Sequence, residues 1–289
     1  MIKKWIFTGD THGGMATIAR VGNIQRNMNC VPEETAIIIL GDAGLNFYLN
    51  NTDKKYKKLL NNQGYHIYCV RGNHEERPEN IPGMVLIEDE NVGNLVWFEE
   101  AYSNIRYFVD GNVYNIDNHS VLVLGGAYSV DKWYRLARAG YARDEAETAN
   151  PKKCGWFKDE CLTPEEMKVI SESCAGKKFD FVLSHTCPLS WEPSDLFLGG
   201  IDQTTVDKSM EIWMDDLKNK IDWRIWLFGH YHADRIERPC VEQMYMDYED
   251  LNTIWNRWYG EKTYAKEWWL PKSPWMKWYD QSQEDKTDG

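Results

Sequence analysis

The chain has 289 residues, of which 43% are hydrophobic, and a formal net charge of -12. This length suits one large domain with a sizeable core, or two small ones. The acidic balance argues against a protein that coats nucleic acid nonspecifically, because phosphate binding requires clustered Lys and Arg. The opening apolar run, residues 5–7, is too short for a secretion signal, and no stretch reaches the length of a membrane-spanning helix. We therefore expect a soluble cytoplasmic protein without a membrane partner.

Short apolar runs along the chain predict strands. They read "WIFTGD", "AIIILGD", "YHIYCVRGNH", "VLVLGGAYS", "FDFVLSH" and "WRIWLFGH", and helical segments are predicted at 15–27, 53–62, 164–174 and 206–218. This alternation indicates an α/β protein whose sheets are covered on their faces. Residues 94–124 instead predict several consecutive strands, which add antiparallel pairs to the fold.

Composition predicts how the chain is organised. We expect one domain over 1–245, with a polar insertion at about 128–161 that contains a partial helix and a loop. The stretch 246–289 holds six of the fourteen tryptophans. Leu251, Ile254, Trp255 and Trp258 follow the spacing of an amphipathic helix. We expect this extension to pack on the domain and to end in a frayed tail, with a partner surface as the alternative.

All but one of the apolar runs end in side chains that can bind metal. In chain order these side chains are Asp10, His12, Asp42, Asn73, His74, His185, His230 and His232. Ligands gather beyond the carboxyl ends of strands in an open α/β sheet, so we expect these residues to converge. A single histidine at a strand end is usually structural. Here five of the chain's seven histidines lie at such ends, which indicates a shared site instead.

The four-residue stretch "GHYH" carries two of these histidines. In an extended strand end, residues i and i+2 point to the same side. This geometry predicts that His230 and His232 face one cleft, as Asp10 and His12 do.

The ligand set combines carboxylates, an amide and imidazoles, and contains no thiolate. Such a set suits divalent ions such as Mn, Fe, Zn or Ni, and we favour Mn. Two ions need a shared ligand, and a carboxylate can bridge where an imidazole cannot. Asp42, alone at its strand end, is the natural bridge.

The motifs "GDTHG" (9–13), "GD" (41–42), "GNHE" (72–75), the histidine His185 and "GHYH" (229–232) together resemble the ordered motif series of the calcineurin-like metallophosphoesterases. The resemblance implies an α/β fold of mixed α+β type: a four-layer αββα sandwich with two mixed sheets and a dinuclear metal site at the strand C-terminal ends. It implies that Asp10, His12 and His232 hold one ion, that Asn73, His185 and His230 hold the other, and that Asp42 bridges them. It also implies that His74 faces the substrate as general acid or phosphate-binding residue.

Two metal ions about 3.5 to 4 Å apart activate a bridging water and clamp phosphoryl oxygens. We expect the resulting metal-bridging hydroxide to attack phosphorus while His74 protonates the leaving oxygen. In the Ser/Thr phosphoprotein phosphatases of this superfamily an Asp and an Arg follow the second motif. Here Leu45 and Asn46 take their places. This departure counts against a protein phosphatase.

The insertion offers a cationic phosphate clamp. Lys132, Arg135 and Arg138 are spaced three apart, so a helix would place them near one face, beside Trp133 and Tyr134. A solvated helix face without a ligand is the alternative.

The sequence therefore predicts a phosphoric ester hydrolase that cleaves monoester or diester bonds of a small phosphorylated substrate, with nucleotides favoured. The alternatives are a nuclease on DNA or RNA, a protein phosphatase, and a metal-binding scaffold without activity. The acidic balance disfavours nucleic acid as the partner.

Overall fold

A computed structural model of the chain describes residues 1–260. Residues 1–248 form one compact unit, and the chain from Glu249 onward belongs to a second. The second unit contains helix α7 (Leu251–Tyr259), which covers the predicted amphipathic segment. The rest of the predicted Trp-rich extension, 261–289, lies outside the described residues.

The strands of the first unit form two mixed sheets. The first sheet has the order β1-β2-β3-β6-β5-β4 within residues 1–248, and the second has the order β11-β12-β10-β9-β8-β7. The strand bounds are β1 (Lys4–Thr8), β2 (Thr35–Ile39), β3 (His66–Cys69), β4 (Met84–Asp89), β5 (Asn94–Glu99), β6 (Ile105–Phe108), β7 (Val113–Ile116), β8 (His119–Leu124), β9 (Lys178–Ser184), β10 (Asp222–Phe228), β11 (Arg235–Arg238) and β12 (Val241–Gln243), followed by β13 (Tyr248–Asp250) at the unit boundary.

The centre of each sheet is parallel, and antiparallel pairs lie toward the margin at β4 in the first sheet and at both margins of the second. β1 pairs with β2, β2 with β3 and β3 with β6 in parallel, and β8, β9 and β10 are parallel in the second sheet. The pairs β4–β5, β5–β6 and β7–β8 are antiparallel, which confirms the expectation for the middle of the chain.

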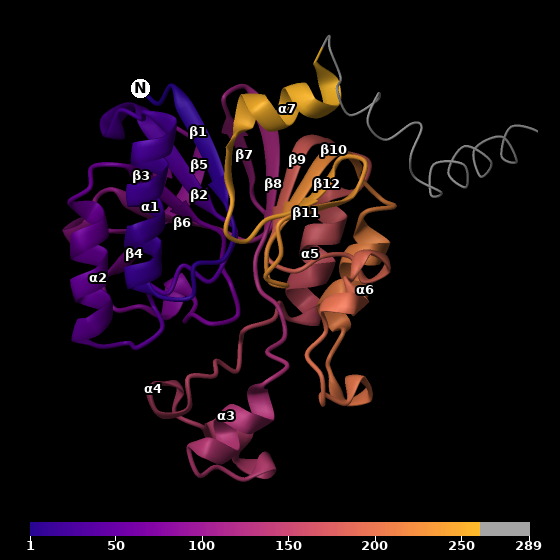
Figure 1. The fold of residues 1–289 in the computed structure, drawn as a ribbon. Coiled ribbons are helices and arrows are strands. Elements are labelled where there is room, and N and C mark those ends of the chain that lie inside the picture. Colours follow the sequence, from indigo (N-terminus) through magenta and orange to yellow (C-terminus); the bar gives the residue numbers. More distant parts are fainter. Residues whose placement is uncertain (261–289) are drawn as a thin grey trace, which may run out of the picture. The chain divides into compact units, whose positions relative to one another are not determined.

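Helices cover the outer face of each sheet (Figure 1). The helices of the first unit are α1 (Gly14–Met28), α2 (Asn51–Asn61), α3 (Lys132–Arg138), α4 (Pro151–Cys154), α5 (Pro164–Cys174) and α6 (Ser209–Leu217). α1 and α2 pack on the first sheet through apolar residues such as Val21 and Leu60. α5 and α6 pack on the second sheet through residues such as Ile170 and Met214. The α/β prediction is therefore confirmed as a four-layer αββα sandwich.

Alternate residues of the strands face the opposite sheet. Phe7 of β1 and Phe181 of β9 meet between the sheets, with ring centroids 5.8 Å apart, and both are fully buried. This inner core fixes the two sheets face to face. The carboxyl ends of their parallel strands therefore come together at one edge.

Three differences from the predicted elements stand out. β4 lies outside the predicted runs, because it is a sheet-edge strand with exposed apolar residues such as Val85. α6 begins at Ser209, three residues later than predicted. The insertion has its own small core, in which Leu136 of α3 packs with Ala146, Cys154 and Trp156.

None of the helices within residues 1–260 has the length and apolar character required to cross a bilayer.

Candidate metal centre

The predicted ligands follow the central parallel strands of both sheets. Asp10 and His12 follow β1, Asp42 follows β2, and Asn73 follows β3. His185 follows β9, and His230 and His232 follow β10. The sandwich therefore brings residues from the two ends of the first unit to the same edge of the molecule.

The backbone turns sharply at several of these residues. The φ angles of His12, Asp42, His230 and His232 are 48°, 50°, 68° and 55°, in the left-handed region. Our expectation that His230 and His232 lie in extended backbone is therefore wrong. Non-glycine residues adopt this region at a cost that surrounding structure must offset, and such positions cluster at functional sites.

Glycines before the ligands allow the close packing of the site. Gly41 has a φ of +97°, and a Cβ there would lie 2.0 Å from Nδ1 of His185. A Cβ on Gly229 would lie 2.2 Å from Oδ1 of Asp10. The Gly-Asp and Gly-His pairs of the motifs thus let a backbone from one sheet approach a ligand from the other.

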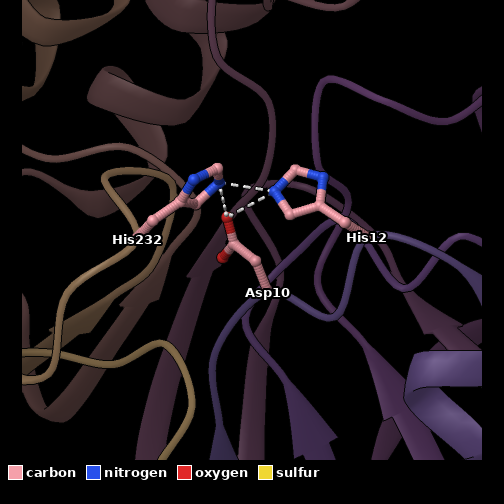
Figure 2. A group of neighbouring side chains, drawn as sticks. All are labelled: Asp10, His12 and His232. Carbon is pink, nitrogen blue, oxygen red and sulfur yellow. Dashed lines mark hydrogen bonds and ion pairs between the residues drawn. The ribbon is translucent and has the colours of Figure 1, made fainter. Parts of the chain in front are cut away.

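One group of side chains joins Asp10, His12 and His232 (Figure 2). The Nε2 atoms of the two imidazoles are 2.5 Å apart, and each lies 3.6 Å from Oδ2 of Asp10. The backbone N–H of His230 donates to the same carboxylate and orients it. Two imidazole nitrogens and a carboxylate oxygen that face one point form a suitable donor set for a divalent ion.

A second group lies around Asp42 and His185, both almost fully buried. Nδ1 of His185 donates to the carbonyl oxygen of Leu40 at 2.8 Å. Nε2 of His185 then faces Oδ1 of Asn73, also at 2.8 Å. Burial lowers the pKa of His185, but Asp42 and Asp10 raise it to about 9, which favours a proton on the Nε2 that faces Asn73 when no metal is bound. A metal ion can take the place of that proton.

The carboxylate of Asp42 lies between the two groups. Its Oδ2 is buried without a hydrogen-bond partner in the described structure, and it lies 3.6 Å from Nδ1 of His12 and from Nε2 of His185. Burial raises the pKa of this carboxyl, but His185 and His74 hold it well below its usual range. A buried carboxylate oxygen that lies between imidazoles and receives no hydrogen bond fits a cation that both groups share.

His74 occupies the rim of the site. Its backbone N–H donates to Oδ1 of Asp42 at 2.8 Å, and Nε2 of its ring lies 4.0 Å from Oδ2. Its ring lies near enough to His12 and Asp42 to complete a third group of possible ligands. Distance alone does not separate a ligand from an acid here, so the acid role of His74 stays a prediction.

Two buried residues behind Asn73 carried no signal in the sequence. Nδ2 of Asn73 donates to Oγ of Ser129 at 2.8 Å, and this hydroxyl donates to Oε2 of Glu160 at 2.5 Å. The backbone N–H of Ser129 donates to Oε1 of the same carboxyl at 3.0 Å. These bonds fix the amide so that its oxygen points into the centre. Partners of this kind orient metal ligands and tune affinity.

A cavity of about 340 Å³ opens beside the centre. Its lining includes ligand residues such as His12 and His230 together with His74 and Arg135. Lys132 and Arg138, the other predicted clamp residues, are not part of the lining: the Lys132 ammonium lies 4.2 Å from the ring centre of Trp156, and Arg138 is exposed. Arg135 is therefore the clamp candidate that the structure places beside the ligands.

Comparison with known proteins defines the family. The model of the calcineurin-like phosphoesterase family matches residues 4–234, so the chain belongs to this family. Membership makes it a phosphoesterase-type hydrolase that depends on metal ions, and the clustered Asp and His side chains supply candidate ligands.

Solved structures with a similar trace include the protein TT1561 of Thermus thermophilus, at 11% identity and a TM-score of 0.43, covering 86% of this chain and 98% of that one. A protein serine/threonine phosphatase from Saccharomyces cerevisiae matches at 14% identity and a TM-score of 0.34, covering 84% of this chain and 66% of that one. A search of curated proteins finds no match.

Proposed function

We propose that the protein hydrolyses phosphomonoester or phosphodiester bonds of a small substrate at a centre of two divalent ions. The observation that carries this proposal is the convergence of Asp10, His12, Asp42, His185 and His232 beside a cavity that His74 also lines. A nitrogen-rich ligand set with carboxylates suits Mn, Fe, Zn or Ni, and we favour Mn. When bound, such ions act as Lewis acids on phosphoryl oxygens and on water.

The ligands divide by position. Asp10, His12 and His232 would hold one ion, and Asn73, His185 and His230 would hold the other. Asp42 would serve both, because its Oδ2, which receives no hydrogen bond, lies between the two groups.

The residues on the cavity wall would handle the substrate. His74 would pass a proton to the leaving oxygen, since imidazole exchanges protons near neutral pH. Arg135 is held by two hydrogen bonds, from Nε to Asp131 at 2.7 Å and from Nη1 to the carbonyl of Gly155 at 2.9 Å. Its remaining Nη2 edge would grip a phosphoryl oxygen.

A hydrolysis screen tests the proposal. The purified protein, supplied separately with Mn, Fe, Ni and Zn, would be offered para-nitrophenyl phosphate and bis(para-nitrophenyl) phosphate. We expect turnover with at least one metal, and the ratio of the two rates would separate monoesterase from diesterase. Absence of turnover with all four metals would overturn the proposal and favour a metal-binding scaffold.

The same screen would include a phosphopeptide and single-stranded DNA. Faster turnover of either than of small esters would favour the protein phosphatase or the nuclease. We expect neither, because the cavity is small and the chain carries a net charge of -12.

A further inference from the structure

The cavity beside the metal centre has an apolar wall that the ligand motifs do not include. This wall comes from the segment between β9 and α6 and consists of Leu196, Phe197, Leu198, Ile201 and Val206. The ring of Phe197 stacks on that of Tyr231, with centroids 6.5 Å apart and planes at 25°. Tyr231 lies between the ligands His230 and His232 in the sequence. The apolar wall therefore adjoins the segment of the metal ligands through the contact between Phe197 and Tyr231.

A buried carboxylate lies in the same wall. Glu211, on α6, is 3% exposed, and its Oε1 accepts a hydrogen bond from Oγ1 of Thr186 at 2.7 Å. Its other oxygen, Oε2, receives no hydrogen bond from any described residue. Leaving a buried polar atom unsatisfied costs stability, so this oxygen marks a place for a donor that comes from outside the chain.

The cations of the cavity do not supply that donor. Nζ of Lys208 donates to Oε1 of Glu192 at 2.7 Å, and Arg135 is paired with Asp131 at 2.7 Å. Each cation of the lining is thus matched to a carboxylate of its own, while Glu211 has no salt bridge among the described residues. This end of the cavity therefore offers a hydrogen-bond acceptor that neither Lys208 nor Arg135 occupies.

The three observations describe one kind of ligand. An aromatic ring fits against Phe197 and Tyr231, because aromatic rings gain from offset or tilted stacking. An N–H group on that ring satisfies Oε2 of Glu211. A site built around a substrate N–H discriminates strongly against the analogue that lacks it, because its own polar atom is then left unpaired.

Building on the phosphoesterase activity proposed above, we propose that this wall binds the leaving group of the substrate and selects an aromatic ring that carries an amino group. Adenine nucleotides represent this class. The amino group is remote from the ester bond, so it changes binding without changing the chemistry of the leaving oxygen.

Matched nucleotides test the inference. Adenosine and purine riboside, in which hydrogen replaces the amino group, would each be offered as monophosphate and as cyclic phosphate. We expect kcat/KM to favour the adenosine compound by about ten- to a hundredfold, because purine riboside leaves the buried Oε2 of Glu211 without a donor. A second measurement needs neither metal nor turnover: calorimetry on the metal-free protein should give tighter binding of adenosine than of purine riboside.

Two variants and a control assign the preference to residues. Glu211→Met removes the acceptor at similar size, and the ratio of adenosine to purine riboside should fall to near one. Phe197→Ala should lower kcat/KM for both nucleotides by about five- to tenfold, because it removes the stacking partner and leaves the acceptor in place. Glu172→Met changes a carboxylate whose side chain is 67% exposed, on α5, and should leave the ratio unchanged.

The outcomes separate this inference from the function on which it rests. If neither nitrophenyl ester is hydrolysed with any metal, the proposed function fails. If the nitrophenyl esters are hydrolysed but the two nucleosides bind and react equally, or no nucleotide is turned over, the leaving-group assignment is overturned and the phosphoesterase stands. Equal ratios in the wild type and in Glu211→Met would also overturn it.

Discussion

Replacing Ser129 by alanine should weaken metal binding at the site that contains Asn73. The Ser129 hydroxyl accepts from the amide of Asn73 at 2.8 Å and donates to the buried carboxyl of Glu160 at 2.5 Å. Alanine leaves Nδ2 of Asn73 and Oε2 of Glu160 without these partners, at a place where Ser129 itself is 2% exposed, while the backbone N–H of residue 129 still donates to Oε1 of Glu160. The amide is then no longer fixed with its oxygen toward the metal.

The size of the effect follows from these two lost bonds. Each buried polar atom left unsatisfied costs about 1–3 kcal/mol, so the loss of two such bonds should lower the free energy of unfolding of the metal-free protein by about 2–6 kcal/mol. Loss of a partner that orients a metal ligand lowers metal affinity by about ten- to a hundredfold. Because Asn73 belongs to one ligand group, we expect one of two binding events to weaken and the other to persist.

Isothermal titration of the metal-free protein with Mn²⁺ measures both events, and denaturant unfolding measures stability. Glu160→Gln is a milder change, because it keeps the size of the side chain and the Ser129 hydroxyl itself. It places an amide N–H, a second donor, against the Ser129 hydroxyl where the carboxylate accepted a hydrogen bond. Ser103→Ala, at an exposed serine, is the matched control. Unchanged affinities for both ions in Ser129→Ala would refute the reasoning, whatever happened to stability.

Three further outcomes are expected. His74→Ala should retain both metals while turnover falls by about a hundredfold or more, whereas Asp42→Ala should lose at least one metal, as measured by metal analysis of the purified variants. Gly41→Ala should cost about 1–3 kcal/mol of unfolding free energy and reduce metal content, because its φ of +97° and the nearby imidazole leave no room for a Cβ. Arg77 pairs with Glu166 at 2.7 Å and, against the effect of burial, lowers the pKa of that carboxyl to about 2. The pair therefore stabilises the fold above the unfolded pKa of about 4.5, and this stability is lost as the pH falls toward 2. In denaturant unfolding, Glu166→Gln should lower the free energy of unfolding by about 1 kcal/mol at pH 7, after discounting for the 39% exposure of the side chain. Near pH 2 the substitution should change nothing.

Three results would contradict these expectations. Metal loss in His74→Ala would make this histidine a ligand. Normal metal content in Gly41→Ala would mean that the backbone adapts to a Cβ. A pH-independent effect of Glu166→Gln would mean that its ion pair contributes little. Glu172→Gln, at an exposed carboxylate, gives the baseline for the effect of removing one negative charge.

The strands and the ligand positions could be predicted because their signals are local. A run such as "AIIILGD" is buried on both faces of a parallel strand, and the first polar residue after it must lie at the sheet's carboxyl edge. The same rule places Asp10 after β1 and His185 after β9. Convergence then needs only that the strands be parallel and the two sheets face each other.

The backbone of the ligand turns could not be predicted in this way. Period-two alternation applies to extended chain, but His230 and His232 both adopt positive φ. Their side chains reach the centre because the backbone turns at both residues. Gly229 allows the close approach to the neighbouring strand end, since a Cβ there would lie only 2.8 Å from the carbonyl oxygen of Leu40. The prediction named suitable residues for a wrong geometric reason.

Glu211 and Glu160 illustrate a second limit. In the sequence each is one acidic residue among many in a chain with 45 of them, and a solvated surface is the ordinary expectation. Their burial arises from packing between segments far apart in the chain, and it raises the pKa of each to about 7. Only the folded structure distinguishes them from the exposed acidic residues.

The base of the insertion is tied to the metal centre by buried hydrogen bonds. Ser129 and Glu160 stand at its two ends, so the hydrogen bonds between them close its base, and Nη1 of Arg71 donates to the carbonyl oxygen of Glu160 at 2.7 Å. Arg71 is two residues before Asn73. The closed base therefore lies directly behind a predicted metal ligand, while α3, inside the insertion, carries Arg135 to the cavity. The polar insertion therefore contacts the centre at two places. Ser129 and Glu160 fix the ligand Asn73, and Arg135 lines the cavity beside the ligands.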